Sequence, residues 1–388
     1  MIAPTSFFAD YGCHVRILEE ILVLQKMGNR ITLCTYHNGQ DVDGLDIRRT
    51  ASIPWRKHYE VGSSRHKIAF DGLLGLTTLA TALRTHPDII HAHLHEGALI
   101  GFPISRLRGV PLVFDFQGSL TGEMIDHRFL NPNGAFYRPM RRLEEWIDHL
   151  PDAILTSSQH ATNLLISEFN CTPENISIIP DCVNPDTFTP QQSPKRLQVL
   201  RAAWSIPTHR KTVVYLGLLA HYQGTDLLLE AAAILRRERD DVHFLIMGYP
   251  AVDQYQAKAR RLGLDSHVTF TGKIPYSEAP QYLALGDVAV APKMSATEGS
   301  GKILNYMAMA LPTVAFDVPV SREYLADLGL YAQPGDAASL AERICYALDH
   351  EEEAKEIGCR LRQRAIEHYS WDRAGKEIME IYHLVRAR

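Results

Sequence analysis

The sequence has little of what marks a secreted, membrane-spanning or nucleic-acid-binding protein. Its 388 residues include only six cysteines, none in a C-x-x-C pair, which disfavours a disulfide scaffold and favours a reduced, cytoplasmic setting. The formal net charge of −5 excludes a strongly basic nucleic-acid binder. The chain has no apolar run of the ~18 residues that a spanning helix needs, and no signal peptide is visible.

The glycine pattern also excludes a common class of enzyme. No G-x-G-x-x-G follows a predicted strand, and the first glycine loop holds the single Gly12. A nicotinamide-dependent dehydrogenase is therefore disfavoured. The chain opens on Met1–Pro4, which resembles the end of a strand, so the sequence leaves open whether the native protein begins upstream of Met1.

What the sequence does contain is a regular alternation of short apolar runs and longer amphipathic segments. Runs such as Ile31–Tyr36 and Pro111–Phe114 are separated by helical patterns such as Val15–Met27. Apolar runs of this length, separated by helices, predict parallel sheets covered on both faces. Hydrophobic residues make up 46% of the chain, enough for two cores.

The alternation stops at Pro180–Pro194, which contains four prolines, and restarts at Thr212–Leu216. We therefore predict an α/β protein of two Rossmann-like, doubly wound domains that face each other across a cleft, with boundaries at residues 1–190 and 191–370. Ligands of such sheets bind at the carboxyl ends of the strands. The last segment, 371–388, is predicted to be a helix that returns to the first domain.

The segment Ser295–Asp317 carries the strongest chemical signal. A predicted strand leads into Glu298-Gly-Ser-Gly-Lys302, and a helix follows. Glycines let backbone N–H groups approach a ligand closely, and the start of a helix attracts anions. Lys302 and Asn305 are three residues apart and share one helix face. The pattern favours a phosphate site, although an ordinary strand–turn–helix remains an alternative.

This segment resembles the signature of the GT4 family of retaining GT-B glycosyltransferases, E-G-x-G followed by an acidic residue and [AY]-M-A-x-G-x-P. Similar landmarks cover nearly the whole chain. They include Tyr215–Ala233 at the start of the second domain, Val268–Gly272, Pro87–His93, and His368–Asp372 before the last helix.

The resemblance implies transfer of a sugar from a UDP- or GDP-sugar to a glycan, lipid-linked or small-molecule acceptor, with no metal and no further cofactor. It implies that Glu298, Lys302 and His93 act at the reacting sugar and its leaving group. The residues implied to hold the donor are Gly12, Gly217, Gln223, Gly272, Gly299, Ser300, Gly301 and Asn305.

The sequence departs from the family at the positions that neutralise the leaving diphosphate. Leu218 and Gln223 stand where the family has an arginine and a lysine. Losing two cations where negative charge develops is costly. His221 or Lys302 could compensate. An active transferase is the favoured hypothesis, and a non-catalytic sugar-nucleotide-binding protein of the same fold is the alternative.

Three further departures lie near the donor and the sugar. Asn305 replaces the family's acidic helix residue, but its amide can still bond a ribose hydroxyl. Glu298 lies one residue closer to Asn305 than in the family, and Tyr306 is a second candidate for that position. Gln117 stands where the family often has a histidine.

Two other patterns are open to interpretation. His91, His93 and His95 alternate along a predicted strand and could bind a metal, but cleft-lining or core histidines are favoured. The basic stretch Arg48–Lys67, which includes Trp55, could contact the inner face of a membrane peripherally, although a solvated loop is favoured. Asp41-Val-Asp43 has the spacing of the D-x-D metal motif found in the other glycosyltransferase fold, but it is interpreted as a turn.

Overall fold

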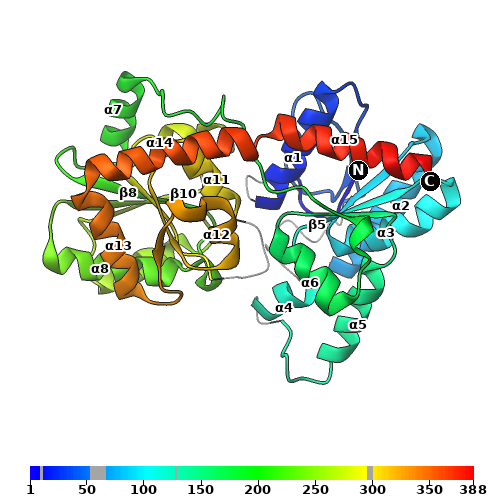
Figure 1. The fold of residues 1–388 in the computed structure, drawn as a ribbon, viewed down its shortest axis with the longest axis horizontal. Helices are drawn as coiled ribbons and strands as arrows, with labels where there is room; N and C mark the ends of the chain where they lie inside the picture. Colours follow the sequence, from blue (N-terminus) through cyan, green and yellow to red (C-terminus); the bar gives the residue numbers. More distant parts are fainter. Residues whose placement is uncertain (9–11, 53–66, 127–128, 295–299) are drawn as a thin grey trace.

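Two parallel sheets organise the computed structural model, which describes residues 1–8, 12–52, 67–126, 129–294 and 300–388 (Figure 1). The first sheet has seven strands in the order β3-β2-β1-β4-β5-β6-β7. Its strands are β1 (Ile2–Ala3), β2 (Thr32–Thr35), β3 (Asp46–Arg49), β4 (Ile90–His93), β5 (Leu112–Phe116), β6 (Ala153–Thr156) and β7 (Ile176–Ile178).

The second sheet has six strands in the order β10-β9-β8-β11-β12-β13. They are β8 (Lys211–Leu216), β9 (Val242–Met247), β10 (Val268–Gly272), β11 (Val288–Ala291), β12 (Thr313–Phe316) and β13 (Leu330–Ala332). In both sheets the chain order reverses beside the first strand, which is where sheets of this kind bind their ligands. The prediction of two doubly wound parallel sheets is confirmed.

The central strands are covered on both faces by packed side chains. Every residue of β4, β5, β9 and β11 is buried. The pairing of β4 with β5 places His93 opposite Asp115 at the carboxyl edge of the first sheet. Polar residues at this edge are therefore surrounded by packed side chains.

Helices cover both faces of the first sheet. α1 (Gly12–Lys26) packs against the last helix on one side, while α2 (Lys67–Thr85), α3 (Leu94–Arg108) and α5 (Tyr137–Asp148) contact one another in sequence on the other. α4 (Leu120–Asp126) and α5 project from the lower edge of this domain in Figure 1. α6 (Gln159–Phe169) leads to β7.

The second sheet is covered in the same way. Its helices are α7 (Pro194–Ala203), α8 (Thr225–Glu238), α9 (Val252–Arg261), α10 (Ala279–Leu283), α11 (Gly301–Ala308), α12 (Pro319–Leu325), α13 (Ala337–Asp349) and α14 (Glu351–His368). α11 packs between the sheet and α14, with Ile303, Leu304 and Met307 buried in the core.

The last helix, α15 (Trp371–Ala387), returns to the first domain and packs on α1, as predicted (Figure 1). The chain crosses between the two domains twice, once near Val183 and once near Tyr369. The two crossing segments lie side by side, and Val183 N–H donates to the Tyr369 carbonyl oxygen at 2.8 Å. Among the described residues, no helix combines the length and apolar character needed to cross a bilayer.

The sequence pattern missed some elements. β3 and β13 were not expected, because β3 is half-exposed at a sheet edge and β13 has only three residues. Three helices, α13, α14 and α15, follow β13, and α13 is separated from α14 at His350 in a stretch without glycine or proline.

Candidate functional site

The candidate donor site lies at the carboxyl ends of β8 and β11, which are neighbours in the second sheet. β8 ends at Leu216 and continues into Gly217. β11 ends at Ala291, and α11 begins at Gly301. The loop after β8 and the start of α11 are therefore brought to the same edge, where α/β sheets bind ligands.

Lys302 reaches from α11 to the loop after β8. Its Nζ donates to Gln223 Oε1 at 2.8 Å and to the Tyr215 hydroxyl at 3.3 Å. The same ammonium lies 4.5 Å from the centre of the Tyr215 ring, within cation–π range. The structure thus brings together two residues, Lys302 and Gln223, that are far apart in sequence.

Gly217 makes room for this ammonium. Its φ of +152° disfavours residues with a side chain. A Cβ atom at this position would lie only 2.7 Å from Lys302 Nζ. A cation is therefore held against bare backbone, in the arrangement that suits a ligand with oxyanions.

Tyr306, one helical turn after Lys302, holds the carboxyl end of β8 through its hydroxyl group. Its hydroxyl accepts from Leu216 N–H at 2.8 Å and lies 3.4 Å from the Val290 carbonyl oxygen. Burial raises the pKa of Tyr306, so the hydroxyl keeps its proton at neutral pH. Tyr306 therefore ties β8, β11 and α11 together instead of facing a ligand.

The first turn of α11 faces the other domain. Ser300 is 5% exposed, and among the described residues its Oγ has no hydrogen-bond partner. A Cβ atom at Gly301 would lie 3.9 Å from Asp181 Oδ2, in the crossing segment. Asn305 is half-buried on the next turn. The helix start thus lies at the junction of the two domains.

The remaining donor-site candidates are more dispersed. Glu298 and Gly299 lie outside the described residues. Gly272 is the last residue of β10, which is separated from β8 by β9. Its φ is +70°, and an added Cβ atom would meet open space. Gly12 begins α1, and a Cβ there would also meet open space. These assignments stay predictions.

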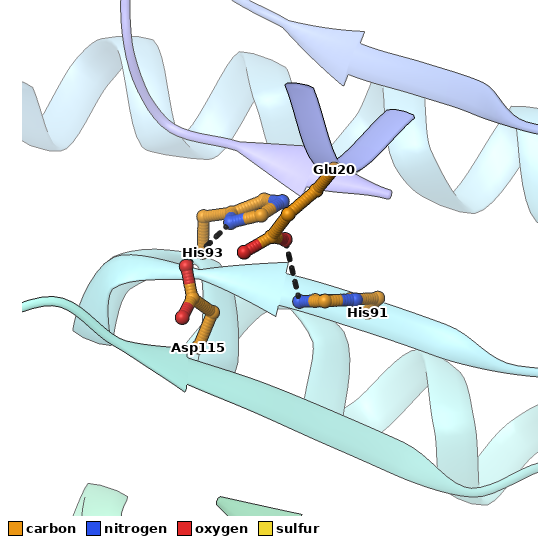
Figure 2. Close-up of side chains that lie close together, drawn as sticks. All are labelled: Glu20, His91, His93 and Asp115. Carbon is orange, nitrogen blue, oxygen red and sulfur yellow. Dashed lines mark hydrogen bonds and ion pairs between the residues drawn. The ribbon is translucent and has the colours of Figure 1, made fainter. Parts of the chain in front are cut away.

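A cluster of buried ionisable groups lies at the carboxyl edge of the first sheet. Figure 2 shows His91 and His93 on β4, Asp115 on β5 and Glu20 on α1 pointing toward one another. His93 Nδ1 lies 3.0 Å from Asp115 Oδ2, and His91 Nε2 lies 3.7 Å from Glu20 Oε2. The two imidazole rings stack with their centres 4.6 Å apart.

Arg16 supplies the positive charge of this cluster. Its Nη2 donates to Asp115 Oδ1 at 2.8 Å, and its Nη1 donates to Asp181 Oδ1 at 3.1 Å. Its Nε also lies 3.1 Å from Glu20 Oε1, one helical turn away. Arg16 is 4% exposed, so these contacts are formed away from bulk water. α1, β5 and the interdomain crossing are thereby joined.

Burial sets the protonation of the cluster. Desolvation lowers the pKa of His91 and of His93, which keeps both rings neutral at pH 7. Desolvation also raises the pKa of Glu20. Burial alone would raise the pKa of Asp115, but the charge of Arg16 and the contacts with His93 together outweigh it and hold that pKa well below its usual range.

The cluster contains residue types that bind metals, but a cation already lies within it. Glu20, His91, His93 and Asp115 could each offer one ligand atom within a common small volume. However, the Arg16 guanidinium already lies on both carboxylates, where a metal cation would have to compete with it. The arrangement therefore favours an ion-paired core at the carboxyl edge of the first sheet over a metal site.

His93 is fully buried, so it can influence a substrate only through its neighbours. Gln117 is the half-exposed member of this group, and its Nε2 donates to Asp115 Oδ2 at 2.7 Å. Sequence reasoning did not identify Arg16 or Asp181. The position of Arg16, one turn after Gly12, was the available signal, but nothing in the sequence shows that its partners lie on β5 and in the crossing.

Two sequence-family models match the chain. "Glycosyltransferase Family 4" matches residues 12–187, and "Glycosyl transferases group 1" matches residues 210–350. The chain is 25% identical to a D-inositol 3-phosphate glycosyltransferase of Corynebacterium aurimucosum, over 96% of this chain and 90% of that one. It is 26% identical to a 2-deoxystreptamine glucosyltransferase of Streptomyces kanamyceticus, over 72% of this chain and 75% of the relative.

Solved structures agree on the fold. Sucrose-phosphate synthase from Thermosynechococcus elongatus superposes with a TM-score of 0.84 at 16% identity, covering 100% of this chain and 98% of the other. HepE from Anabaena, in complex with UDP-glucose, superposes with a TM-score of 0.74 at 16% identity, covering 98% of this chain and 97% of the other. The family models show that the chain belongs to the GT4 family and is a glycosyltransferase, and the superpositions show that its fold is of the GT-B type.

Proposed function

We propose that this protein transfers a sugar from a UDP- or GDP-sugar, with retention of anomeric configuration, to a small-molecule, glycan or lipid-linked acceptor. The observation that carries the proposal is the Lys302 ammonium, held between Gln223 and the bare backbone of Gly217. A diphosphate at this edge would meet both a cation and the start of α11.

The contacts of Lys302 support it as the cation that replaces the family's arginine and lysine. Lys302 Nζ lies 2.8 Å from the side chain at position 223, which is one of the two changed positions. The other candidate, His221, is 67% exposed and pairs with Asp226 at 3.3 Å. These contacts favour Lys302 as the compensating cation.

The protein's part in the reaction is to position the donor and stabilise its leaving group. Lys302 and the N–H groups at the start of α11 offset the charge that develops on the departing diphosphate. The acceptor enters from the first domain, beside Gln117, and attacks on the face from which the diphosphate leaves. The leaving phosphate oxygen accepts the acceptor's proton, so no buried carboxylate of the Arg16 cluster is needed as a base.

The named relatives favour a small hydroxylated acceptor. One is named for D-inositol 3-phosphate and another for 2-deoxystreptamine. HepE, which has the same fold, was solved with UDP-glucose. We therefore propose that UDP-glucose and inositol phosphate are the first pair to test, followed by GDP-sugars and longer acceptors.

The test is a transfer assay with the parent protein, with Lys302→Ala and with Lys355→Ala. Lys355 is an exposed lysine of α14 that pairs with Glu351 and serves as the matched control. We expect Lys302→Ala to lower kcat/KM about 100-fold, with kcat falling more than diphosphate affinity, because the cation acts mainly on the leaving group. The control should retain activity.

The product's anomeric configuration, read by proton NMR, tests retention separately. Inversion would contradict the proposed stereochemistry while leaving the transferase intact. Diphosphate binding without turnover on any donor and acceptor pair would instead favour the alternative, a non-catalytic sugar-nucleotide-binding protein.

A further inference from the structure

The outward face of α5 carries an unusual set of side chains. The exposed residues of this helix are two arginines, a proline, a leucine and a tryptophan: Arg138, Pro139, Arg142, Leu143 and Trp146. The side chain of Trp146 is 51% exposed. On a helix, positions 138, 142 and 146 follow one another along one stripe, so the tryptophan and the arginines share a face.

The acidic residues of α5 are turned away from this face. Glu144 is fully buried and accepts from the Ser119 hydroxyl at 2.7 Å and from Thr121 N–H at 3.0 Å. Asp148 is also buried, 3.2 Å from His95 Nε2. Glu145 is half-exposed and accepts from Asn170 at 3.2 Å. The helix is therefore cationic outward although its sequence holds as many acids as bases.

The segment that leads into α5 adds exposed aromatic rings. Phe129 is 58% exposed and Phe136 is 78% exposed, at the two ends of a stretch with no charged residue. In Figure 1 this stretch joins α4 to α5 where they project from the first domain. We call residues 129–148 the α5 lobe. Its exposed residues include no carboxylate, in a chain whose net charge is −5.

We propose that the α5 lobe docks on the surface of an anionic lipid bilayer. The phenylalanines and Trp146 would enter the interface between headgroups and acyl chains, where amphipathic aromatic rings are favoured. Arg138 and Arg142 would lie at the level of the phosphates.

Charge favours a lipid surface over a symmetric dimer of this chain. In a twofold dimer the same face of each copy would meet, and Arg138 and Arg142 would then lie against their own counterparts. Exposed aromatic residues flanked by arginines, with Glu145 as the one half-exposed acid of the lobe, match the two contributions of a bilayer surface, which are apolar burial and a negative potential. The proposed docking of the lobe on a bilayer does not depend on the proposed sugar transfer.

This assignment differs from the membrane contact that the sequence left open at Arg48–Lys67, where a solvated loop was favoured. Most of that stretch lies outside the described residues. The part that is described pairs internally: Arg48 contacts Asp46 at 3.0 Å, and Arg49 contacts Asp41 at 2.7 Å. The α5 lobe, by contrast, leaves Arg138 and Arg142 exposed on the protein surface.

Vesicle co-sedimentation tests the proposal. The full chain is mixed with vesicles of phosphatidylcholine, or with an equimolar mixture of phosphatidylcholine and phosphatidylglycerol, at low and high salt. We expect binding to the anionic vesicles only, weakened by salt because the charges are exposed. Arg138→Glu with Arg142→Glu should lower the partition constant about tenfold or more. Phe136→Ser with Trp146→Ser should lower it as strongly.

Matched controls come from exposed residues of the second domain. Arg260→Glu on α9 and Val199→Ser on α7, which is 61% exposed, should leave binding unchanged. Because the lobe variants alter exposed side chains, their melting temperatures should stay at the parent value. The proposal is overturned if the parent protein ignores anionic vesicles or if the lobe variants bind them as well as the controls do. A parent dimer that these variants convert to a monomer, without vesicle binding, would also overturn it in favour of self-association.

Discussion

We propose that Lys302 on α11 supplies the positive charge that Leu218 and Gln223 do not. The ammonium arrives from α11, and the loop after β8 contributes only an amide oxygen and the space above Gly217. In the proposed donor site a diphosphate would meet the Lys302 ammonium, but not the two further cations that the family's arginine and lysine would supply. The site should therefore bind diphosphates more weakly than one with additional basic residues in the same loop.

A second cation at this position should strengthen donor binding. In Gln223→Lys, a new ammonium lies beside Lys302, and the two repel each other until a diphosphate neutralises them. We expect a lower melting temperature without ligand and about tenfold tighter UDP or GDP binding, since a hydrogen bond to a charged group contributes about 1.5–3 kcal/mol. Isothermal titration calorimetry measures this. Gln223→Met, which adds no charge, is the control, and equal affinities in the two variants would contradict the assignment.

Local sequence could predict Lys302 because its glycine-rich turn and helix are contiguous. It could not predict the contact with Gln223 or the role of Tyr306, because each depends on which strands are neighbours in the sheet. The Arg16 cluster was missed for the same reason. Its members come from α1, β4, β5 and the crossing, and only the folded sheet brings them within hydrogen-bonding distance.

At the scale of elements, α5 is attached to the first domain through a buried ionic contact. His95, at the start of α3, lies 3.2 Å from Asp148 and 3.8 Å from Glu144, and its ring packs edge-on against Phe114 and Phe116. Burial would lower the pKa of His95, but the hydrogen bond and charge of Asp148 outweigh it and the pKa is raised. Burial raises the pKa of Asp148.

This contact predicts a pH-dependent stability. Because the pKa of His95 is raised on folding, its contribution is complete below its unfolded pKa of about 6.5 and is lost as the pH rises through the folded value. His95→Gln leaves two buried carboxyl groups without this partner and should cost about 3–5 kcal/mol near pH 6. The cost should be smaller near pH 9.

Urea denaturation of the parent, His95→Gln and the exposed control His209→Gln at both pH values measures this difference. A cost for His95→Gln that grows with pH, or that matches the control, would show that the imidazole is not charged in the folded protein.

Most strands were predictable because residues buried on both faces form short, continuous apolar runs. β3 and β13 were not, because an edge strand is half-exposed and its sequence resembles a loop.

At the scale of the whole molecule, α15 joins the two domains. Trp371, Ile378 and Tyr382 pack with Val23 and Leu24 of α1 in one buried cluster. The Tyr382 hydroxyl also lies 2.6 Å from His91 Nδ1, so the returning helix reaches the ionisable cluster at the cleft edge. The sequence indicated that the last helix returns, but it could not indicate that the helix contacts His91.

The close packing of α15 on α1 depends on Gly375. A Cβ atom there would lie 2.6 Å from Val23 Cγ2 and 2.9 Å from Met27 Cε. We expect Gly375→Ala to destabilise the protein by about 1–3 kcal/mol, because the two helices must separate slightly. Gly72→Ala on α2 is the matched control, since a Cβ there meets nothing within 4 Å. It should be neutral or stabilising by up to about 1 kcal/mol. Thermal unfolding compares them, and equal effects would contradict this packing.

The central claim is that a nucleoside diphosphate binds where Lys302 meets the loop after β8. The most direct measurement is a thermal-shift panel with UDP, GDP, ADP and dTDP on the parent protein, Lys302→Ala and the control Lys355→Ala. A ligand that binds only the folded state raises its melting temperature. The account predicts a clear shift with UDP or GDP that persists in Lys355→Ala and is smaller in Lys302→Ala. No shift with any diphosphate, or an undiminished shift in Lys302→Ala, would contradict it.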